Sequence, residues 1–136
     1  ELECKVVEAT EEDQAFFDLL PGEKIISLKR VHTANGIPVM ANFTRFPEDG
    51  FAYIEHENLQ NRSLYDSIRL HKGCTPKLDG ECILSSERAV GKLAEYLSVP
   101  EGEPLFRLNG HYVDAQNRPL MAEEQIMIGS RYSIAL

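Results

Sequence analysis

The fold of this chain is decided by residues 25–46, which read IISLKRVHTANGIPVMANFTRF. Asn35-Gly36 lies between two apolar runs, and this arrangement is the strongest short-range signal for a β-hairpin. The first strand is expected over Ile25–Thr33, and the return strand begins at Pro38 and ends at Phe46. A hairpin of this length needs further strands or helices to bury its apolar side chains.

A second copy of this unit occupies the C-terminal half. Residues 22–28, GEKIISL, match residues 102–108, GEPLFRL, at an offset of 102 − 22 = 80. Residues 38–41, PVMA, match residues 119–122, PLMA, at an offset of 119 − 38 = 81. Convergence could make two helix-break-hairpin units look alike, but the shared Gly-Glu and Pro-x-Met-Ala favour duplication. Both hairpins are therefore expected in one antiparallel sheet, related by an approximate two-fold, with a ligand cleft between the halves.

The rest of the chain supplies flanking elements. The apolar and capping patterns predict, in order, a strand over Leu2–Val7, a helix from Thr10 to Pro21-Gly22, a helix from Ser63 to Gly73, a strand ending at Cys82–Ser85 and a helix over Glu87–Leu97. The apolar face of the first helix includes Leu20, and that of the third includes Val90. Helices that alternate with hairpins indicate an α+β fold, an antiparallel sheet flanked by helices with two pseudo-repeated helix-hairpin units.

Composition excludes several classes of protein. The 136 residues suit one globular domain, with 43% hydrophobic and 26% charged residues. Because 22 acidic residues outnumber 14 basic ones, the net charge of −8 gives no general attraction to nucleic acid or to an anionic membrane. No apolar run approaches the roughly 20 residues of a membrane span. The three cysteines lack CxxC spacing and are expected to be free, buried thiols in a reducing cytoplasm.

No enzyme or metal signature is present. The chain contains no GxGxxG, GxxxxGK[ST] or GxSxG motif, and its four histidines show no HExxH spacing. We therefore expect no cofactor, no metal and no catalytic residue.

One face of the first hairpin strand combines apolar and cationic side chains. Ile26, Leu28, Arg30 and His32 share this face because side chains alternate along a strand. The guanidinium of Arg30 can bond two oxygens of a carboxylate or phosphate at once. We expect Arg30 and His32 to bind the anionic end of a ligand. The alternative is that Arg30 lies on the outer face and pairs with an exposed carboxylate.

Two further groups could complete such a site. Ser63 begins a helix, whose free N–H groups attract anions, and the Tyr65 hydroxyl follows two residues later. The alternative is a plain N-cap beside a half-buried tyrosine. One face of the last strand has the mixed polarity that suits a small polar ligand, or else a solvated edge, and carries Met121, Glu123, Gln125 and Met127.

Several segments, in order, resemble the UTRA domain, the C-terminal effector-binding domain of HutC-type GntR transcription regulators. The segments are residues 28–38 of the first hairpin, 63–66, 100–105, Pro119 in the second hairpin, and 129–132. The resemblance implies an antiparallel sheet related to the chorismate lyase fold. It also implies a small effector, such as a sugar phosphate, amino acid, fatty acid or phosphonate, that controls an N-terminal winged-helix domain outside this chain.

The resemblance also implies site residues. The basic pair of the family's first hairpin falls on Arg30 and His32, and its helix-start Ser-x-Tyr falls on Ser63 and Tyr65. The last-strand ligand contacts fall on or beside Met121 and Met127. Methionine at those positions, and His in place of a second Arg, depart from the sugar-phosphate sensors while keeping an anion-binding end.

We therefore predict the effector-sensing and dimerisation domain of a bacterial GntR/HutC-type regulator. It is expected to be a cytoplasmic homodimer that binds a small anionic or polar effector, contacts DNA only through the missing N-terminal domain, and contacts no membrane. Two alternatives remain: a chorismate lyase-like enzyme acting on a small anionic substrate, and a pure dimerisation module with an empty cleft.

Overall fold

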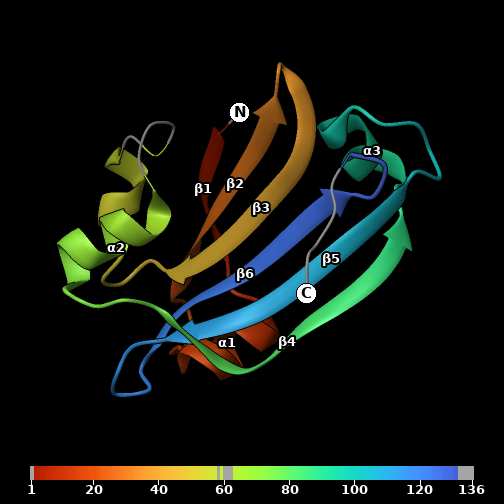
Figure 1. Ribbon diagram of the computed structural model, residues 1–136. Helices are drawn as coiled ribbons and strands as arrows, with labels where there is room; N and C mark the ends of the chain where they lie inside the picture. Colours follow the sequence, from red (N-terminus) through yellow and green to blue (C-terminus); the bar gives the residue numbers. More distant parts are fainter. Residues whose placement is uncertain (1, 58, 60–62, 132–136) are drawn as a thin grey trace.

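The computed structural model describes residues 2–57, 59 and 63–131. Its elements are β1 (Leu2–Glu8), α1 (Glu11–Phe17), β2 (Lys24–Ala34), β3 (Ile37–Pro47), the 3-10 helix η1 (Ala52–His56), α2 (Leu64–Lys72), β4 (Lys77–Arg88), α3 (Gly91–Leu97), β5 (Pro104–Val113) and β6 (Pro119–Ile128). The strands form one six-stranded antiparallel sheet in the order β1-β2-β3-β6-β5-β4 (Figure 1). The predicted α+β class is confirmed. No helix in the described part of the chain is long and apolar enough to span a bilayer.

The sheet is built from two copies of one unit, β1-α1-β2-β3 and β4-α3-β5-β6, joined by the pairing of β3 with β6 (Figure 1). In that pairing Phe43 lies opposite Glu124, and 124 − 43 = 81 is the repeat offset of the return strands. A residue that pairs with its own repeat equivalent marks the axis of an approximate two-fold. The residues that end α1 and α3, Asp18 and Ser98, both adopt a left-handed conformation. Both hairpins lie in one sheet, as duplication predicts.

The first hairpin has the predicted turn, but a bulge changes the register behind it. Asn35-Gly36 has positive φ at both residues, 54° and 78°, as a type I′ turn requires. The pair next to the turn is Ala34 with Ile37, and an unbroken ladder from that pair would place Ala41 opposite Arg30. A register shift between His32 and Thr33 places Asn42 opposite Arg30 instead. Because a one-residue slip moves every side chain to the other face, this bulge decides which β3 residues neighbour Arg30.

Two predicted helix boundaries are wrong. The third helix begins at Gly91 rather than Glu87, because β4 continues to Arg88 and keeps its backbone hydrogen bonds with β5. Val90 therefore precedes the helix and is 64% exposed, and Leu20 lies beyond the end of α1 and is 68% exposed. The pairing of β4 with β5 prevents the third helix from starting at Glu87, and the left-handed conformation of Asp18 ends α1 before Leu20. The spacing of the apolar residues alone therefore predicts helices that are too long.

The strand predicted to end at Cys82–Ser85 is longer, and its cysteine is not buried. Strand β4 spans Lys77–Arg88 and forms an outer edge of the sheet, so Cys82 is exposed. Cys4 and Cys74 are half-buried. All three cysteines are free, but the expectation that all are buried is wrong for Cys82.

The helices pack on opposite faces of the sheet. On the α2 face, two residues of α2 pack against residues of β2, β3 and β6, in a cluster that includes Leu64, Ile68, Ile26, Leu28, Phe46 and Met121. On the α1–α3 face, α3 packs in a second cluster that includes Ala94, Leu97, Ala41, Leu105, Ile126 and Ile128. The repeat accounts for α1 and α3, whereas α2 has no counterpart in the other half. The α2 face is therefore asymmetric.

Candidate functional site

Strands β2, β3 and β6 lie side by side in the sheet (Figure 1). A band of polar side chains crosses these three strands on the α2 face. The register places Arg30 beside Asn42 and Asn42 beside Gln125, and the next row places Thr44 beside Glu123. Asn42 and Thr44 are buried, at 6% and 1% exposure, and the other three side chains are half-buried. We call these five residues the polar band.

Three atoms of the polar band are buried without a hydrogen-bond partner among the described residues. They are Arg30 Nε, Asn42 Oδ1 and Thr44 Oγ1. Native proteins contain few such atoms, and leaving one unpaired costs about 1–3 kcal/mol. The guanidinium nitrogen is a donor, the amide oxygen is an acceptor, and the hydroxyl can be either. A ligand with complementary groups would offset that cost.

The band contains one charge of each sign, and the two interact at a distance. Burial raises the pKa of Glu123, which the hydrogen bond from Gln125 and the charge of Arg30 partly counteract. The Gln125 Nε2 donates to Glu123 Oε1 at 3.0 Å. Burial lowers the pKa of Arg30, and the charge of Glu123 opposes that change. Within the described residues the two form no direct ion pair, so each charge is only partly compensated.

His32 extends the band along β2. Burial, and after it the charge of Arg30, lowers the pKa of His32 below its usual 6.5, so the imidazole is neutral at pH 7. Its Nε2 lies 3.3 Å from Asn42 Nδ2. Because the amide nitrogen is a donor, we assign Nε2 as the acceptor and place the ring proton on Nδ1. This bond uses the Asn42 amide nitrogen and leaves Oδ1 available.

Two tyrosines border the band near Glu123. Tyr65 comes from α2 and Tyr112 from β5, and their rings meet edge to face with centroids 6.3 Å apart. Burial raises the pKa of both phenols, and the charge of Glu123 raises both further. The tyrosines are therefore neutral, and they supply apolar ring surface and hydroxyls beside the carboxylate.

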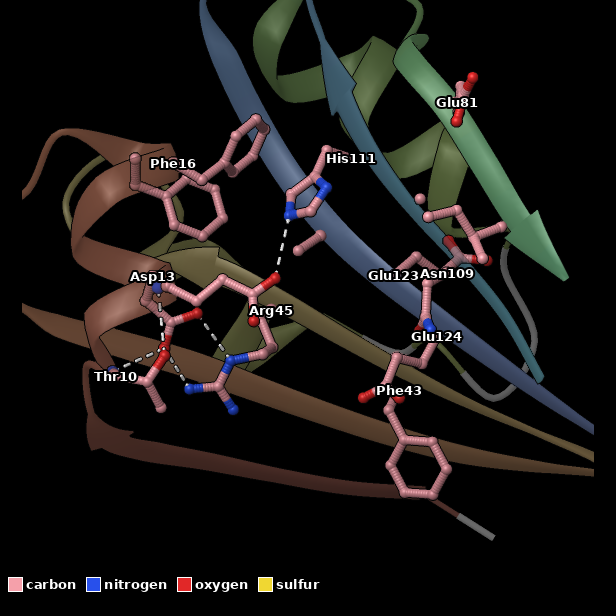
Figure 2. Close-up of a pocket in the computed structure, with 15 residues that line it drawn as sticks. Thr10, Asp13, Phe16, Phe43, Arg45, Glu81, Asn109, His111, Glu123 and Glu124 are labelled. Atoms are coloured by element: carbon pink, nitrogen blue, oxygen red, sulfur yellow. Dashed lines mark hydrogen bonds and ion pairs between the residues drawn. The ribbon is translucent and has the colours of Figure 1, made fainter. Parts of the chain in front are cut away.

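A hollow of about 500 Å³ opens on the opposite, α1–α3 face, between α1 and the strands β3, β6, β5 and β4 (Figure 2). Two pairs of its charged side chains interact, and none of its lining residues has a buried side-chain atom without a hydrogen-bond partner among the described residues. Asp13 is 5% exposed and accepts hydrogen bonds from Arg45, with Nε to Oδ1 at 2.9 Å. His111 Nε2 lies 3.6 Å from the carboxylate of Glu12. The hollow has few buried groups left for a ligand, so the polar band is the stronger candidate.

Comparison with known proteins identifies the family. A model of the UTRA domain matches residues 2–133. The chain belongs to the UTRA family. No curated protein matches the sequence of this UTRA domain. Within the described residues, no group of three or more His, Cys, Asp or Glu side chains could hold a metal ion.

Solved structures share the fold. A GntR-family transcriptional regulator from Enterococcus faecalis V583 has a TM-score of 0.83 and 19% identity, over 98% of this chain and 95% of that one. The C-terminal domain of Yurk from Bacillus subtilis has a TM-score of 0.85 and 18% identity, over 98% and 91%. The effector domain of PhnF from Mycobacterium smegmatis has a TM-score of 0.80 and 19% identity, over 98% and 81%. At such identities the likeness concerns the fold alone.

The UTRA domain brings together five of the eight residues singled out from the sequence. These are Arg30, His32, Tyr65, Glu123 and Gln125. They lie on the sheet face that carries the buried Ile26 and Leu28, so the outer-face alternative for Arg30 is wrong.

The other three residues lie outside this group. Ser63 is exposed, and its hydroxyl caps α2 by accepting a hydrogen bond from the Asp66 amide at 3.5 Å. Met121 is fully buried in the apolar cluster of the α2 face. Met127 is 1% exposed and pairs with Met40, in the row beyond Asn42 and Gln125.

Sequence reasoning missed Asn42, Thr44 and Tyr112. A signal existed for the first two, because they share one face of β3 with the apolar Met40 and Phe46 and so lie on its inward side. Polar residues at inward positions of a strand are unusual and indicate a site or a buried network. Their position beside Arg30 depends on the bulge after His32, which the sequence did not predict.

Proposed function

We propose that this UTRA domain is the effector-sensing domain of a bacterial GntR regulator of the HutC subfamily. Its effector is a small polar or anionic molecule bound at the polar band. The observation that carries this proposal is that three buried polar atoms of the band have no hydrogen-bond partner among the residues that the structure describes, and a ligand would supply those partners. Binding alters the DNA affinity of a winged-helix domain outside this chain.

The structural neighbours support the regulatory role. They are described as transcriptional regulators and, for PhnF, as an effector domain. The likeness to the longer PhnF structure covers 98% of this chain but only 58% of that one, so PhnF carries a further region. A net charge of −8 suits a domain that leaves DNA contact to such a region.

The proposal includes a homodimer, located in the cytoplasm. Free thiols such as those of this chain remain reduced in that compartment. Strand β4 supports self-association, because it is an outer edge of the sheet and exposes Ile83 and Leu84 at 56% and 48%. Light scattering coupled to size-exclusion chromatography should give twice the mass of the chain. A monomer at micromolar concentration would contradict the dimer without affecting the effector site.

The effector site is tested by screening a library of small metabolites for thermal stabilisation. A ligand at 100 times its Kd adds about 2.7 kcal/mol to the free energy of unfolding. Arg30→Ala should weaken binding of the hit by about tenfold to a hundredfold, because a hydrogen bond to a charged group contributes about 1.5–3 kcal/mol. Lys29→Ala is the matched control, since Lys29 is the next residue of β2 and points to the other face.

Equal affinities of the wild type and Arg30→Ala would refute the site. We propose binding without chemical turnover. Conversion of the bound hit into a product by the isolated domain would instead support the enzyme alternative.

A further inference from the structure

We infer that the effector is a small zwitterion, with a carboxylate held by Arg30 and a protonated amine held by Glu123, as in an α-amino acid. This inference rests on the proposed function, because it concerns the same site. It follows from one donor and two oxygens that lack partners among the described residues, and from two opposite charges on β2 and β6, the strands on either side of β3.

The β2 side of the band presents a cationic donor. Arg30 Nε is buried and lacks a hydrogen-bond acceptor among the described residues. The guanidinium is half-buried, and Glu123 is not close enough to form a direct ion pair with it within the described chain. A ligand carboxylate placed against Arg30 would satisfy this donor with a charge-assisted hydrogen bond. The neutral His32 adds no second positive charge, so one carboxylate is sufficient to balance this side.

The β6 side of the band presents the opposite chemistry. Glu123 is a half-buried carboxylate with one hydrogen bond, from Gln125, to its Oε1. Two further oxygens, Asn42 Oδ1 and Thr44 Oγ1, lie on the strand between Arg30 and Glu123 and have no hydrogen-bond partner within the described part of the chain. A protonated amine carries up to three N–H donors and a positive charge, which suits one carboxylate and two neutral oxygens.

The aromatic residues strengthen the assignment of this side to a cation. Tyr112 lies diagonally across from Glu123 in the sheet, because Gly110 pairs with Glu123, and the ring of Tyr65 meets that of Tyr112 with centroids 6.3 Å apart. A cation held by Glu123 is attracted by the electrons of nearby aromatic rings. An anion in the same position would meet the negative charge of Glu123.

Charge balance separates a zwitterion from simpler ligands. A monoanion would neutralise Arg30 and leave Glu123 as a half-buried charge without its partial compensation from Arg30. A simple amine would neutralise Glu123 and leave the half-buried charge of Arg30 without its partial compensation from Glu123. Only a ligand with both charges compensates both residues.

The test uses three matched sets of probes on this chain: the common L-amino acids, the amines that remain after decarboxylation, and the acids that remain after deamination. Calorimetric titration should show binding of at least one amino acid, and removal of either its amine or its carboxylate should weaken binding about tenfold or more. Glu123→Gln should weaken binding of that amino acid by a similar factor. The same variant should narrow the difference in affinity between the amino acid and its deaminated acid. Glu124→Gln is the matched control, because the next residue of β6 faces the other side of the sheet.

Three results would overturn the inference. They are an acid that binds as tightly as the amino acid, an affinity unchanged by Glu123→Gln, and no binding of any amino acid at millimolar concentration. If an acid without an amine binds and Arg30→Ala abolishes that binding, the zwitterion is refuted while the effector site stands. If a hit from any set is insensitive to Arg30→Ala, the proposed site itself fails.

Discussion

The ion pair between Asp13 and Arg45 connects α1 with β3. Its removal gives a quantitative test of how α1 packs on the sheet. Asp13 is 5% exposed and closes a capping box with Thr10, while its side chain also accepts two hydrogen bonds from Arg45. The change Asp13→Asn removes the charge but keeps the size and one acceptor oxygen. The neighbouring Glu11→Gln is the control, since Glu11 is an exposed acid in the same helical turn.

The expected loss can be estimated from the geometry. Removing one partner of a fully buried pair costs about 3–5 kcal/mol. The Arg45 side chain is 30% exposed, so its charge remains partly solvated. We expect Asp13→Asn to lower the free energy of unfolding by about 2–3 kcal/mol, or about 7–10 °C in Tm for a domain of this size. Glu11→Gln should cost less than about 0.5 kcal/mol.

The repeat provides a compensating double variant. Asp13 corresponds to Leu93 (93 − 13 = 80) and Arg45 to Ile126 (126 − 45 = 81), and in the second half these apolar residues belong to one packed cluster. Asp13→Leu alone leaves Arg45 without its partner. Adding Arg45→Ile should restore at least half of the loss, because apolar residues often replace an ion pair with little change in stability.

The pH dependence has a definite sign. Burial tends to raise the pKa of Asp13, but the hydrogen bonds from Arg45 and Thr10 outweigh it and hold the pKa below 3.8. A carboxyl with a lowered folded-state pKa contributes full stability above its unfolded pKa and loses it as the pH falls through the folded value. The stability difference between wild type and Asp13→Asn should therefore be constant near pH 7 and shrink below about pH 4.

Urea denaturation monitored by far-UV circular dichroism measures each free energy, and the slope with denaturant should stay unchanged. A loss below about 0.5 kcal/mol for Asp13→Asn would refute the importance of the pair. A double variant less stable than both single variants would refute the equivalence of the two halves. A stability difference that grows on acidification would contradict the sign of the pKa shift.

Two further outcomes follow from burial. Without a ligand, Glu123→Gln should raise the free energy of unfolding at pH 7 by about 1 kcal/mol, because burial raises the pKa of this carboxyl and its charge opposes folding. Glu124→Gln breaks an ion pair on the other face of the sheet and should lower the free energy of unfolding. Urea denaturation that shifts the stability of both variants in the same direction would contradict this expectation. After brief alkylation with iodoacetamide, mass spectrometry should find Cys82 modified first, because Cys82 is exposed while burial raises the pKa of Cys4 and Cys74. Faster modification of Cys4 or Cys74 would contradict their burial.

Local signals in the sequence specify the units of this fold. Asn35-Gly36 specified the hairpin through local backbone preferences, and the capping box of Thr10 and Asp13 specified the start of α1. The repeat predicted that both hairpins lie in one sheet, since the return strands of two like units can pair with each other about an approximate two-fold axis. These signals act between residues that are close in sequence or that recur at a fixed offset.

Alternation along the strand also determined half of the site. The sequence placed Arg30 and His32 on one face of β2, and Glu123 and Gln125 on one face of β6, because side chains on a strand alternate with a period of two. It gave no means of deciding whether the two faces were the same. Ser63 matched a helix start and is one, but nothing in that local pattern fixes its distance from the sheet.

Which residues of the site meet depends on long-range packing and strand register. The bulge after His32 shifts the β3 register by one residue and so brings Asn42, rather than Ala41, beside Arg30. The packing of α2 on a single face brings Tyr65 to Glu123 and buries Met121 in the core. A bulge and a helix-to-sheet contact depend on burial and hydrogen bonding summed over distant segments, and no local pattern of residues encodes that sum.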